Sequence, residues 1–162
     1  MSATDDFEEF ARARISQLYR TAWLLTGDRH HAEDLVQETL AKMVTAWQRI
    51  ENPVAYARTA MVRTFVSQRR RKSWSERPTG ELPEVAERSG DPALRLALQS
   101  ALGELEPLDR AVLVLRFFED RSVEQVAFDL GKKTSAITTR TARALERLRA
   151  VLGEGADQLI AL

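Results

Sequence analysis

The residues best suited to chemistry lie between Ser122 and Arg149, in a segment rich in threonine, lysine and arginine. Its second half, from Lys132 onward, holds six basic residues and one acidic residue, Glu146. Lysine and arginine neutralise phosphates or donate to guanine, and threonine contacts phosphate or the thymine methyl group. The composition therefore favours nucleic-acid binding, although a charged run on a helix is more often a solvated surface.

The same segment has the pattern of two helices joined by a tight turn. We expect a short helix from Val123 to Leu130, a turn at Gly131 where a positive φ costs little, and a second helix capped by Thr134 or Ser135. Ser122 and Gln125 are spaced as a capping box. The face that we expect to be buried is apolar and consists of Val126, Ala127, Leu130, Ile137, Ala144, Leu145 and Leu148. This order is the plan of a DNA-binding helix-turn-helix.

A second basic segment runs from 52 to 77, with seven basic residues and one acidic residue. It includes a basic run, 69–72, that begins with three arginines. Three aromatic residues, Tyr56, Phe65 and Trp74, are interleaved with its basic residues. Basic groups neutralise phosphates, and aromatic rings stack on unpaired bases. We expect Tyr56 and Phe65 to be core residues and the arginine run to contact an anion.

The helix predicted from 31 to 47 carries Asp34, Gln37 and Glu38 on one side of an apolar stripe. A metal site is a weak interpretation, because the only two histidines are neighbours in sequence and cysteine is absent. Nothing apolar on an exposed face would raise a carboxylate pKa for acid–base catalysis. We therefore favour a protein-docking face. The chain shows no glycine loop for phosphates and no nucleophile elbow, so we predict no enzyme activity, no cofactor and no metal.

Helical periodicity covers nearly the whole chain and predicts an all-α fold. We expect two small helical domains, 1–72 and 92–162, joined by a flexible acidic linker at 73–91 that holds prolines, glycines and serines. The C-terminal domain contains the helix-turn-helix. Its first helix should supply core leucines, namely Leu94, Leu96, Leu98 and Leu102. The remaining helices are predicted at 4–25, 28–47, 53–72, 92–105 and from 107.

The formal net charge of the 162 residues is zero, but the charge is segregated along the chain. Residues 1–51 are net acidic and residues 52–77 net basic, and local patches of this kind steer partners more than the total does. No apolar run approaches the length of a membrane span, and the first residues lack a signal-peptide pattern. These features predict a cytoplasmic protein without membrane insertion.

Three stretches in this order resemble the sigma factors of RNA polymerase. AEDLVQETL (32–40) is similar to the helix with which the family binds core polymerase, and NPVAYARTAMVRTFVSQRRRK (52–72) is similar to the segment that reads and melts the −10 promoter element. The stretch from 102 to 149 is similar to the domain that reads the −35 element. The closest likeness is to the small extracytoplasmic-function (ECF) group, in a short SigE-like branch common in actinobacteria.

The resemblance implies a role for particular residues. Those expected on the clamp helices of the largest polymerase subunit are Asp34, Leu35, Gln37, Glu38 and Lys42. Those expected near the −10 strand are Arg58, Arg63, Thr64, Ser67, Gln68, Arg69, Arg70 and Arg71. Those expected on the −35 duplex are Lys132, Lys133, Thr134, Ser135, Thr138, Thr139, Arg140 and Arg143. Core RNA polymerase and promoter DNA are the implied partners, and an anti-sigma factor is a further one that the family allows.

The chain departs from the family pattern in the two DNA-reading segments. Many relatives carry Asn and Asp where this chain has Arg63 and Ser67, and Lys and Ser where it has Thr138 and Thr139. Two other functions stay open beside the sigma factor. A stand-alone helix-turn-helix regulator leaves the acidic and basic helices without a role, and a helical protein adaptor leaves the acid-free Arg/Thr face unexplained. These functions can be distinguished by asking whether the chain needs polymerase to bind promoter DNA well, as a sigma factor should.

Overall fold

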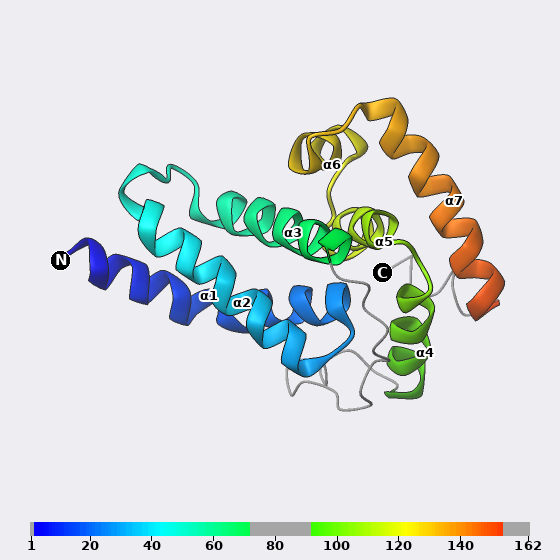
Figure 1. The fold of residues 1–162 in the computed structure, drawn as a ribbon, viewed down its shortest axis with the longest axis horizontal. Coiled ribbons are helices and arrows are strands. Elements are labelled where there is room, and N and C mark those ends of the chain that lie inside the picture. Colours follow the sequence, from blue (N-terminus) through cyan, green and yellow to red (C-terminus); the bar gives the residue numbers. More distant parts are fainter. Residues whose placement is uncertain (1, 72–91, 154–162) are drawn as a thin grey trace.

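The computed structural model describes residues 2–71 and 92–153, which form helices and contain no strand, as the all-α prediction requires (Figure 1). The first half contains α1 (Ala3–Thr26), α2 (Arg29–Ala46), the short 3₁₀ helix η1 (Trp47–Arg49) and α3 (Pro53–Arg71). The second half contains α4 (Pro92–Gly103), α5 (Pro107–Leu113), the π-helical turn η3 (Val114–Phe118), α6 (Val123–Leu130) and α7 (Thr134–Leu152). Within these residues, no helix is both long and apolar enough to cross a membrane.

Local sequence signals set the ends of α1 and α2. Ser2 and Asp5 form a capping box at the start of α1. Gly27 ends that helix in the left-handed region at φ 76°, a conformation that costs glycine little. Asp28 then caps α2 by accepting from the backbone N–H of His30 at 3.3 Å. The predicted boundaries of both helices are thus confirmed to within a residue or two.

The connection from α2 to α3 is held by aromatic packing and a second cap. Trp47 begins η1 and packs against the rings of Phe7 and Phe10 of α1, at centroid distances of 5.4 and 5.6 Å. Asn52 accepts from the backbone N–H of Ala55 at 3.2 Å, and Pro53 is the first residue of α3. Asparagine at the cap and proline at the first helical position are residue types that favour a helix start.

The second half corrects two expectations of the sequence. Leu98 and Leu102 of α4 are buried, but Leu96 is 40% exposed and does not belong to the core. The helix that begins at Pro107 passes into the π turn η3, which the apolar pattern did not predict. The predicted linker, 73–91, lies outside the described residues.

The helix pair α6–α7 has the predicted turn. Ser122 and Gln125 make a capping box at the start of α6, and Gly131 ends it with φ 64°. The N-cap of α7 is Lys133, which gives no side-chain cap, so the predicted capping by Thr134 or Ser135 is wrong. Both residues are instead the first two of the helix, and their carbonyls accept from the hydroxyls of Thr138 and Thr139.

The two halves are not separate bodies in the structure, because one hydrophobic core runs through both. Helices α1 and α3 pack against α4, α5, η3 and α6, and Figure 1 shows α6 lying over α3 while α7 lies on the outer side. Leu25 and Met61 in the first half and Leu102 and Leu115 in the second are at most 1% exposed. The two halves therefore pack against each other through this core, and their division into two domains stays a prediction.

Leu102→Ala should therefore lower the free energy of unfolding of the whole described chain by about 2–5 kcal/mol, because a buried leucine leaves a cavity when truncated. Urea unfolding followed by far-UV circular dichroism measures this. Leu96→Ala on the same helix is the control and should lower the free energy of unfolding much less, since Leu96 is 40% exposed. Two separated transitions, of which only one shifts, would contradict a shared core.

Candidate docking and nucleic-acid interfaces

The outward face of α2 is polar and carries the predicted docking residues. Asp34, Gln37 and Lys42 are exposed, and Glu38 is half-buried. Leu35 is only 1% exposed and packs in the core, so we remove it from the contact set: it fixes the helix from inside. The face is mixed in charge, which suits docking to another charged protein surface.

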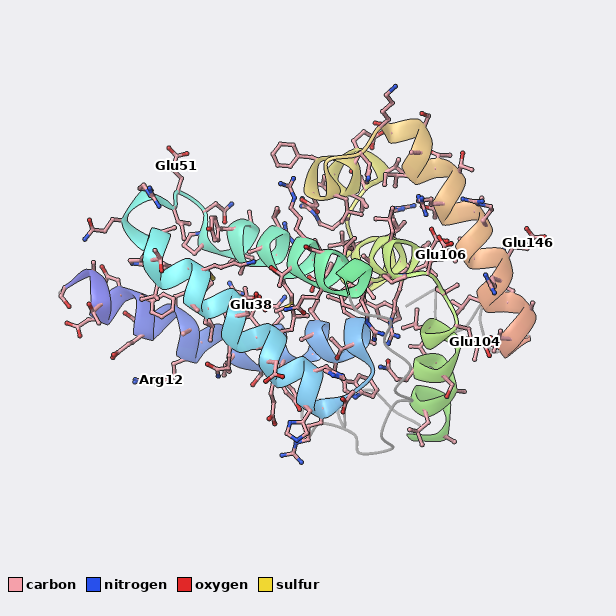
Figure 2. The ribbon with its side chains drawn as sticks, viewed as in Figure 1. Arg12, Glu38, Glu51, Glu104, Glu106 and Glu146 are labelled. Carbon is pink, nitrogen blue, oxygen red and sulfur yellow. The ribbon has the colours of Figure 1, made fainter. Side chains whose placement is uncertain are left out.

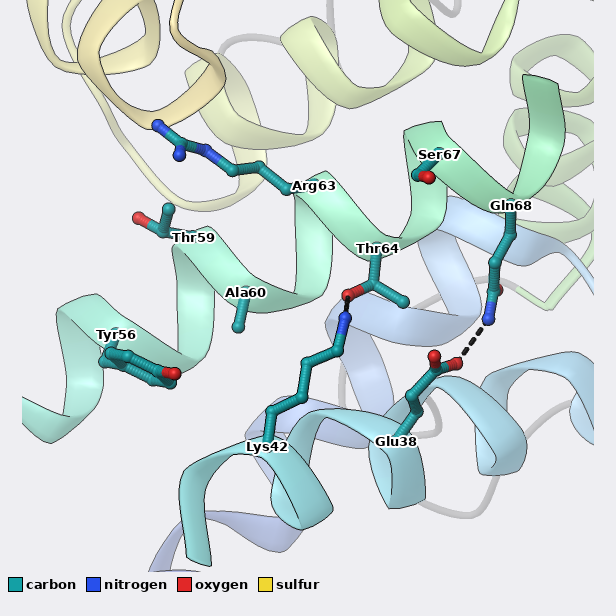
Figure 3. Close-up of a pocket in the computed structure, with 9 residues that line it drawn as sticks. All are labelled: Glu38, Lys42, Tyr56, Thr59, Ala60, Arg63, Thr64, Ser67 and Gln68. Carbon is teal, nitrogen blue, oxygen red and sulfur yellow. Dashed lines mark hydrogen bonds between the residues drawn. The ribbon is translucent and has the colours of Figure 1, made fainter. Parts of the chain in front are cut away.

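A cleft of about 420 Å³ lies between α2 and α3 and joins the docking face to the predicted −10 face (Figure 3). Lys42 donates its ammonium to the hydroxyl of Thr64 at 2.6 Å, and Gln68 donates to the carboxylate of Glu38. The cleft is lined by Glu38, Lys42, Tyr56, Thr59, Ala60, Arg63, Thr64, Ser67 and Gln68. These cross-links fix the spacing of the two helices, so the two predicted sites are parts of one surface.

Several residues that were predicted to lie near the −10 strand point into the chain instead. Thr64 is 5% exposed and is satisfied by Lys42, so it supports the site and does not face a strand. Arg69 donates to the carbonyl of Thr26 at 3.1 Å and lies over the ring of Phe65, and Arg58 is half-buried. Phe65 itself is buried, as expected. The side chains of Arg70 and Arg71 lie outside the described residues.

Arg63 has an unexpected environment. Its guanidinium leaves the cleft and reaches α6, where Nε donates to the carbonyl of Asp129 at 2.7 Å and Nη2 donates to the carbonyl of Phe128 at 3.1 Å (Figure 3). These carbonyls belong to the last turn of α6, where helix backbone acceptors lack intrahelical partners. A residue predicted to read DNA is therefore engaged within the chain.

The outer face of α7 is exposed. In the described part of the chain, the side chains at the start of this face make no contact with a carboxylate. The exposed residues at the turn and along this face are Lys132, Lys133, Thr134, Ser135, Thr138, Thr139 and Arg143. The absence of a side-chain cap leaves the first backbone N–H groups of α7 available to an anion, which the helix dipole also favours. This arrangement fits a phosphate backbone beside a helix that reads a groove.

Two arginines form ion pairs with acidic residues in or beside the helix pair. Arg121 binds the buried carboxylate of Asp129 with two hydrogen bonds of 2.9 Å. Arg140 binds Asp109 at 2.8 Å and Glu106 at 3.6 Å, and Figure 2 shows Glu106 at the start of α5, beside α7. Arg140 is thus half-buried and ties α7 to α5, whereas Arg143 is exposed.

The C-terminal end of α1 is a site that the sequence analysis missed. The carbonyl of Trp23 accepts from Gln99 at 2.8 Å, and that of Leu24 accepts from Arg110 at 2.7 Å. Burial, and then the nearby positive charge of Arg69, lower the pKa of Arg110 to about 9, so the group stays charged at neutral pH. One signal was present in the sequence: Arg110 directly precedes the apolar run 111–115, where a buried cation needs a partner.

The described residues hold no cluster of three or more histidine, aspartate or glutamate side chains able to bind a metal ion. His31 pairs with the N-cap residue Asp28, with 2.7 Å between Nδ1 and the carboxylate. His31 thus has a structural role at the start of α2.

Comparison with known families divides the chain into two matched regions. The family described as Sigma-70 region 2 matches residues 10–75, and the family described as Sigma-70, region 4 matches residues 95–148. The first covers α1 to α3, with the cleft, and the second covers α4 to most of α7. The boundary between the two matches falls where the sequence predicts the linker.

Several known proteins are similar to this chain over nearly its whole length. The RNA polymerase sigma-E factor of Streptomyces coelicolor is 37% identical over 152 residues, which cover 89% of this chain and 84% of that protein. The ECF RNA polymerase sigma factor SigE of Mycolicibacterium smegmatis is 27% identical over 97% of this chain and 65% of its own length. The solved structure of the sigma factor RpoE in complex with the anti-sigma factor NepR, from Bartonella quintana, has a TM-score of 0.75, 25% identity, and covers 92% of this chain and 98% of that one.

Arg140 and Arg143 of α7 should differ in their effect on stability. Arg140→Ala removes the bond to Asp109 and should lower the free energy of unfolding by about 1 kcal/mol. Arg143→Ala, on an exposed position, should change it by no more than about 0.5 kcal/mol. Thermal unfolding in low salt measures both values. Equal losses in the two variants would show that Arg140 has no structural role.

Proposed function

The chain belongs to the ECF sigma factors of RNA polymerase, which direct promoter-specific transcription, and we propose how its surfaces share that work. Residues 1–72 bind core polymerase and read the −10 element, residues 92–162 read the −35 element, and 73–91 join them. The observation that carries this proposal is the order of region 2 and region 4 along one chain, with a polar docking face in the first and an acid-poor cationic face in the second.

Core polymerase binds the polar face of α2. The contact residues are the exposed Asp34, Gln37 and Lys42 together with Glu38, and the partner surface is the clamp helices of the largest subunit. Such a surface depends on complementary charge, which sets specificity and the rate of association. The buried Leu35 holds these residues in register along the helix.

The promoter is read by two different helices. The −10 strand runs along the cleft side of α3, where Arg63, Ser67 and Gln68 line the groove and Tyr56 offers a ring for stacking. The −35 duplex binds the exposed face of α7, with Lys132, Lys133 and the first N–H groups on phosphates and Thr138, Thr139 and Arg143 in the groove.

The remaining features of the proposal follow from the same assignment. The protein acts in the cytoplasm as a specificity subunit without catalysis of its own, and it takes no cofactor. An anti-sigma factor is a further partner, since the similar RpoE was solved in complex with one. A stand-alone helix-turn-helix regulator is not favoured, because the face of α2 proposed to bind polymerase would then have no partner.

The decisive experiment is to mix the chain with core RNA polymerase from a Streptomyces species and separate the mixture by gel filtration. Co-elution at one copy per enzyme supports the proposal, and the holoenzyme can then be used to select promoter fragments. Failure of folded protein to co-elute, together with tight binding of duplex DNA by the chain alone, would favour the stand-alone regulator.

Asp34→Arg should weaken binding to core polymerase at least tenfold while leaving duplex DNA binding by the free chain unchanged. The exposed residue lies at the centre of the proposed docking face, and a reversed charge there repels its partner. Titration of labelled chain with core polymerase measures the affinity. Glu9→Arg makes the same charge change on the exposed side of α1 and should have little effect. Equal losses in the two variants would place docking elsewhere.

Arg143→Ala should do the reverse and weaken promoter binding by holoenzyme about 5- to 150-fold, the equivalent of losing one contact of about 1–3 kcal/mol. Binding to core polymerase should stay unchanged. Arg12→Ala, a matched change on α1 (Figure 2), is the control for loss of a surface cation. If Arg143→Ala impaired polymerase binding instead, the assignment of α7 to DNA would be wrong.

A further inference from the structure

Three arginines of α7 share one edge of the helix but differ in their surroundings. Arg140, Arg143 and Arg147 follow one another at spacings of three and four residues, so they lie on the same side of the helix. Arg143 and Arg147 are exposed, whereas Arg140 is half-buried. Arg140 is also the nearest of the three to the start of α7, and the first residues of a recognition helix are those that meet base edges.

Two carboxylates at the start of α5 hold Arg140. Its Nη1 donates to a carboxylate oxygen of Asp109 at 2.8 Å and lies 3.6 Å from a carboxylate oxygen of Glu106. The side chain of Asp109 is 14% exposed and that of Arg140 is 27% exposed, so salt screens this pair less than it screens a surface pair. The contact joins α5 to α7 within the second half of the chain.

A phosphate would gain little by approaching Arg140 in this setting. The guanidinium would have to leave Asp109, and a carboxylate as buried as that one is unfavourable without a partner. A phosphate that approached the paired arginine would be repelled by Glu106, whose side chain is 69% exposed. Two negative charges face one positive charge here, so the edge of α7 beside α5 does not attract an anion.

We propose that Asp109 and Glu106 are positioning residues that determine specificity: by holding Arg140 they keep the phosphate backbone away from the α5 side of α7, so that a duplex binds α7 in one register. The inference rests on the proposed function, because it takes the duplex-reading role of α7 from there. Asp109 and Glu106 act through Arg140 and need no contact with a base.

Repulsion of this kind favours one register among several. A recognition helix can lie in a groove in more than one register, and phosphate contacts hold all of them without regard to sequence. A free cation at position 140 would strengthen the registers in which the α5 side of α7 lies against the backbone. With Arg140 held, the favoured register is the one in which Thr138, Thr139 and Arg143 reach base edges, and discrimination against other registers is a source of specificity.

Asp109→Asn tests the proposal, because asparagine has nearly the same size and lacks the charge that holds Arg140. Glu104→Gln is the matched control, since it removes one negative charge from an exposed position shortly before α5 (Figure 2). Asp109→Asn is also made together with Arg140→Gln, where no cation is left to release. Far-UV circular dichroism first shows that each variant is folded.

The free Asp109→Asn chain should bind a mixed-sequence duplex more tightly than the unchanged chain. The slope of log affinity against log salt should be steeper by about 0.9, the value for one added phosphate contact. The gain in affinity should therefore grow about threefold when the salt is lowered from about 200 to about 50 mM. Glu104→Gln should leave the slope unchanged, and so should Asp109→Asn in the Arg140→Gln background. Fluorescence anisotropy measures these affinities.

A preferred duplex, selected from a random pool by the unchanged chain, measures specificity. Asp109→Asn should leave affinity for this duplex within about twofold while affinity for the mixed sequence rises, so their ratio should fall about threefold or more in low salt. Glu106→Gln, at an exposed position where the fold is not at risk, should change the ratio in the same direction by about twofold.

An unchanged slope in Asp109→Asn, or an equal rise in the Arg140→Gln background, would overturn the holding of Arg140. A selection without any preferred duplex, or equal gains for the preferred and mixed duplexes, would overturn the role in specificity. The proposed function fails separately, and does so if the unchanged chain does not co-elute with core polymerase. The duplex measurements still decide the role of Asp109 in that case, because they use no polymerase.

Discussion

The structure depends on cations placed at the C-terminal ends of helices. At the end of α1, Arg69, Gln99 and Arg110 donate to the carbonyls of the last turn, and the carbonyl of Trp23 that Gln99 contacts also accepts from the backbone N–H of Gly27. Hydrogen bonds to charged groups contribute about 1.5–3 kcal/mol each, and a buried guanidinium without such acceptors would be strongly unfavourable. The end of α1 thus sets where α3, α4 and α5 can lie.

This constraint explains why one core runs through both halves. Once Arg110 is buried against α1, the apolar residues of α5 and η3 must pack against the first half, and residues such as Val112 and Leu115 are fully buried. The same packing brings α6 over α3, where Arg63 donates to the carbonyls of Phe128 and Asp129. Polar and apolar contacts therefore favour one arrangement of the halves.

The arrangement also gives the two proposed DNA-reading surfaces different surroundings. Beside α7, Asp109 of α5 is paired with Arg140, and Asp129 of α6 is paired with Arg121. Lys42 and Gln68 link α2 to α3, so that the residues proposed for docking and for strand reading share one surface. A partner that binds α2 is then positioned to alter what α3 presents.

The helices can be predicted from local sequence signals, because helix periodicity, capping boxes, prolines and the glycines at 27 and 131 act over a few residues. The sequence by itself also indicated the family, and with it the expected docking and DNA-reading segments. The tertiary structure decided what single residues do: Leu35 and Thr64 face inward, Arg140 is an internal ion-pair partner, and Arg63 is held by α6. Contacts such as that of Arg110 with Leu24 join residues 86 positions apart, and no local pattern encodes which distant carbonyl a buried cation will meet.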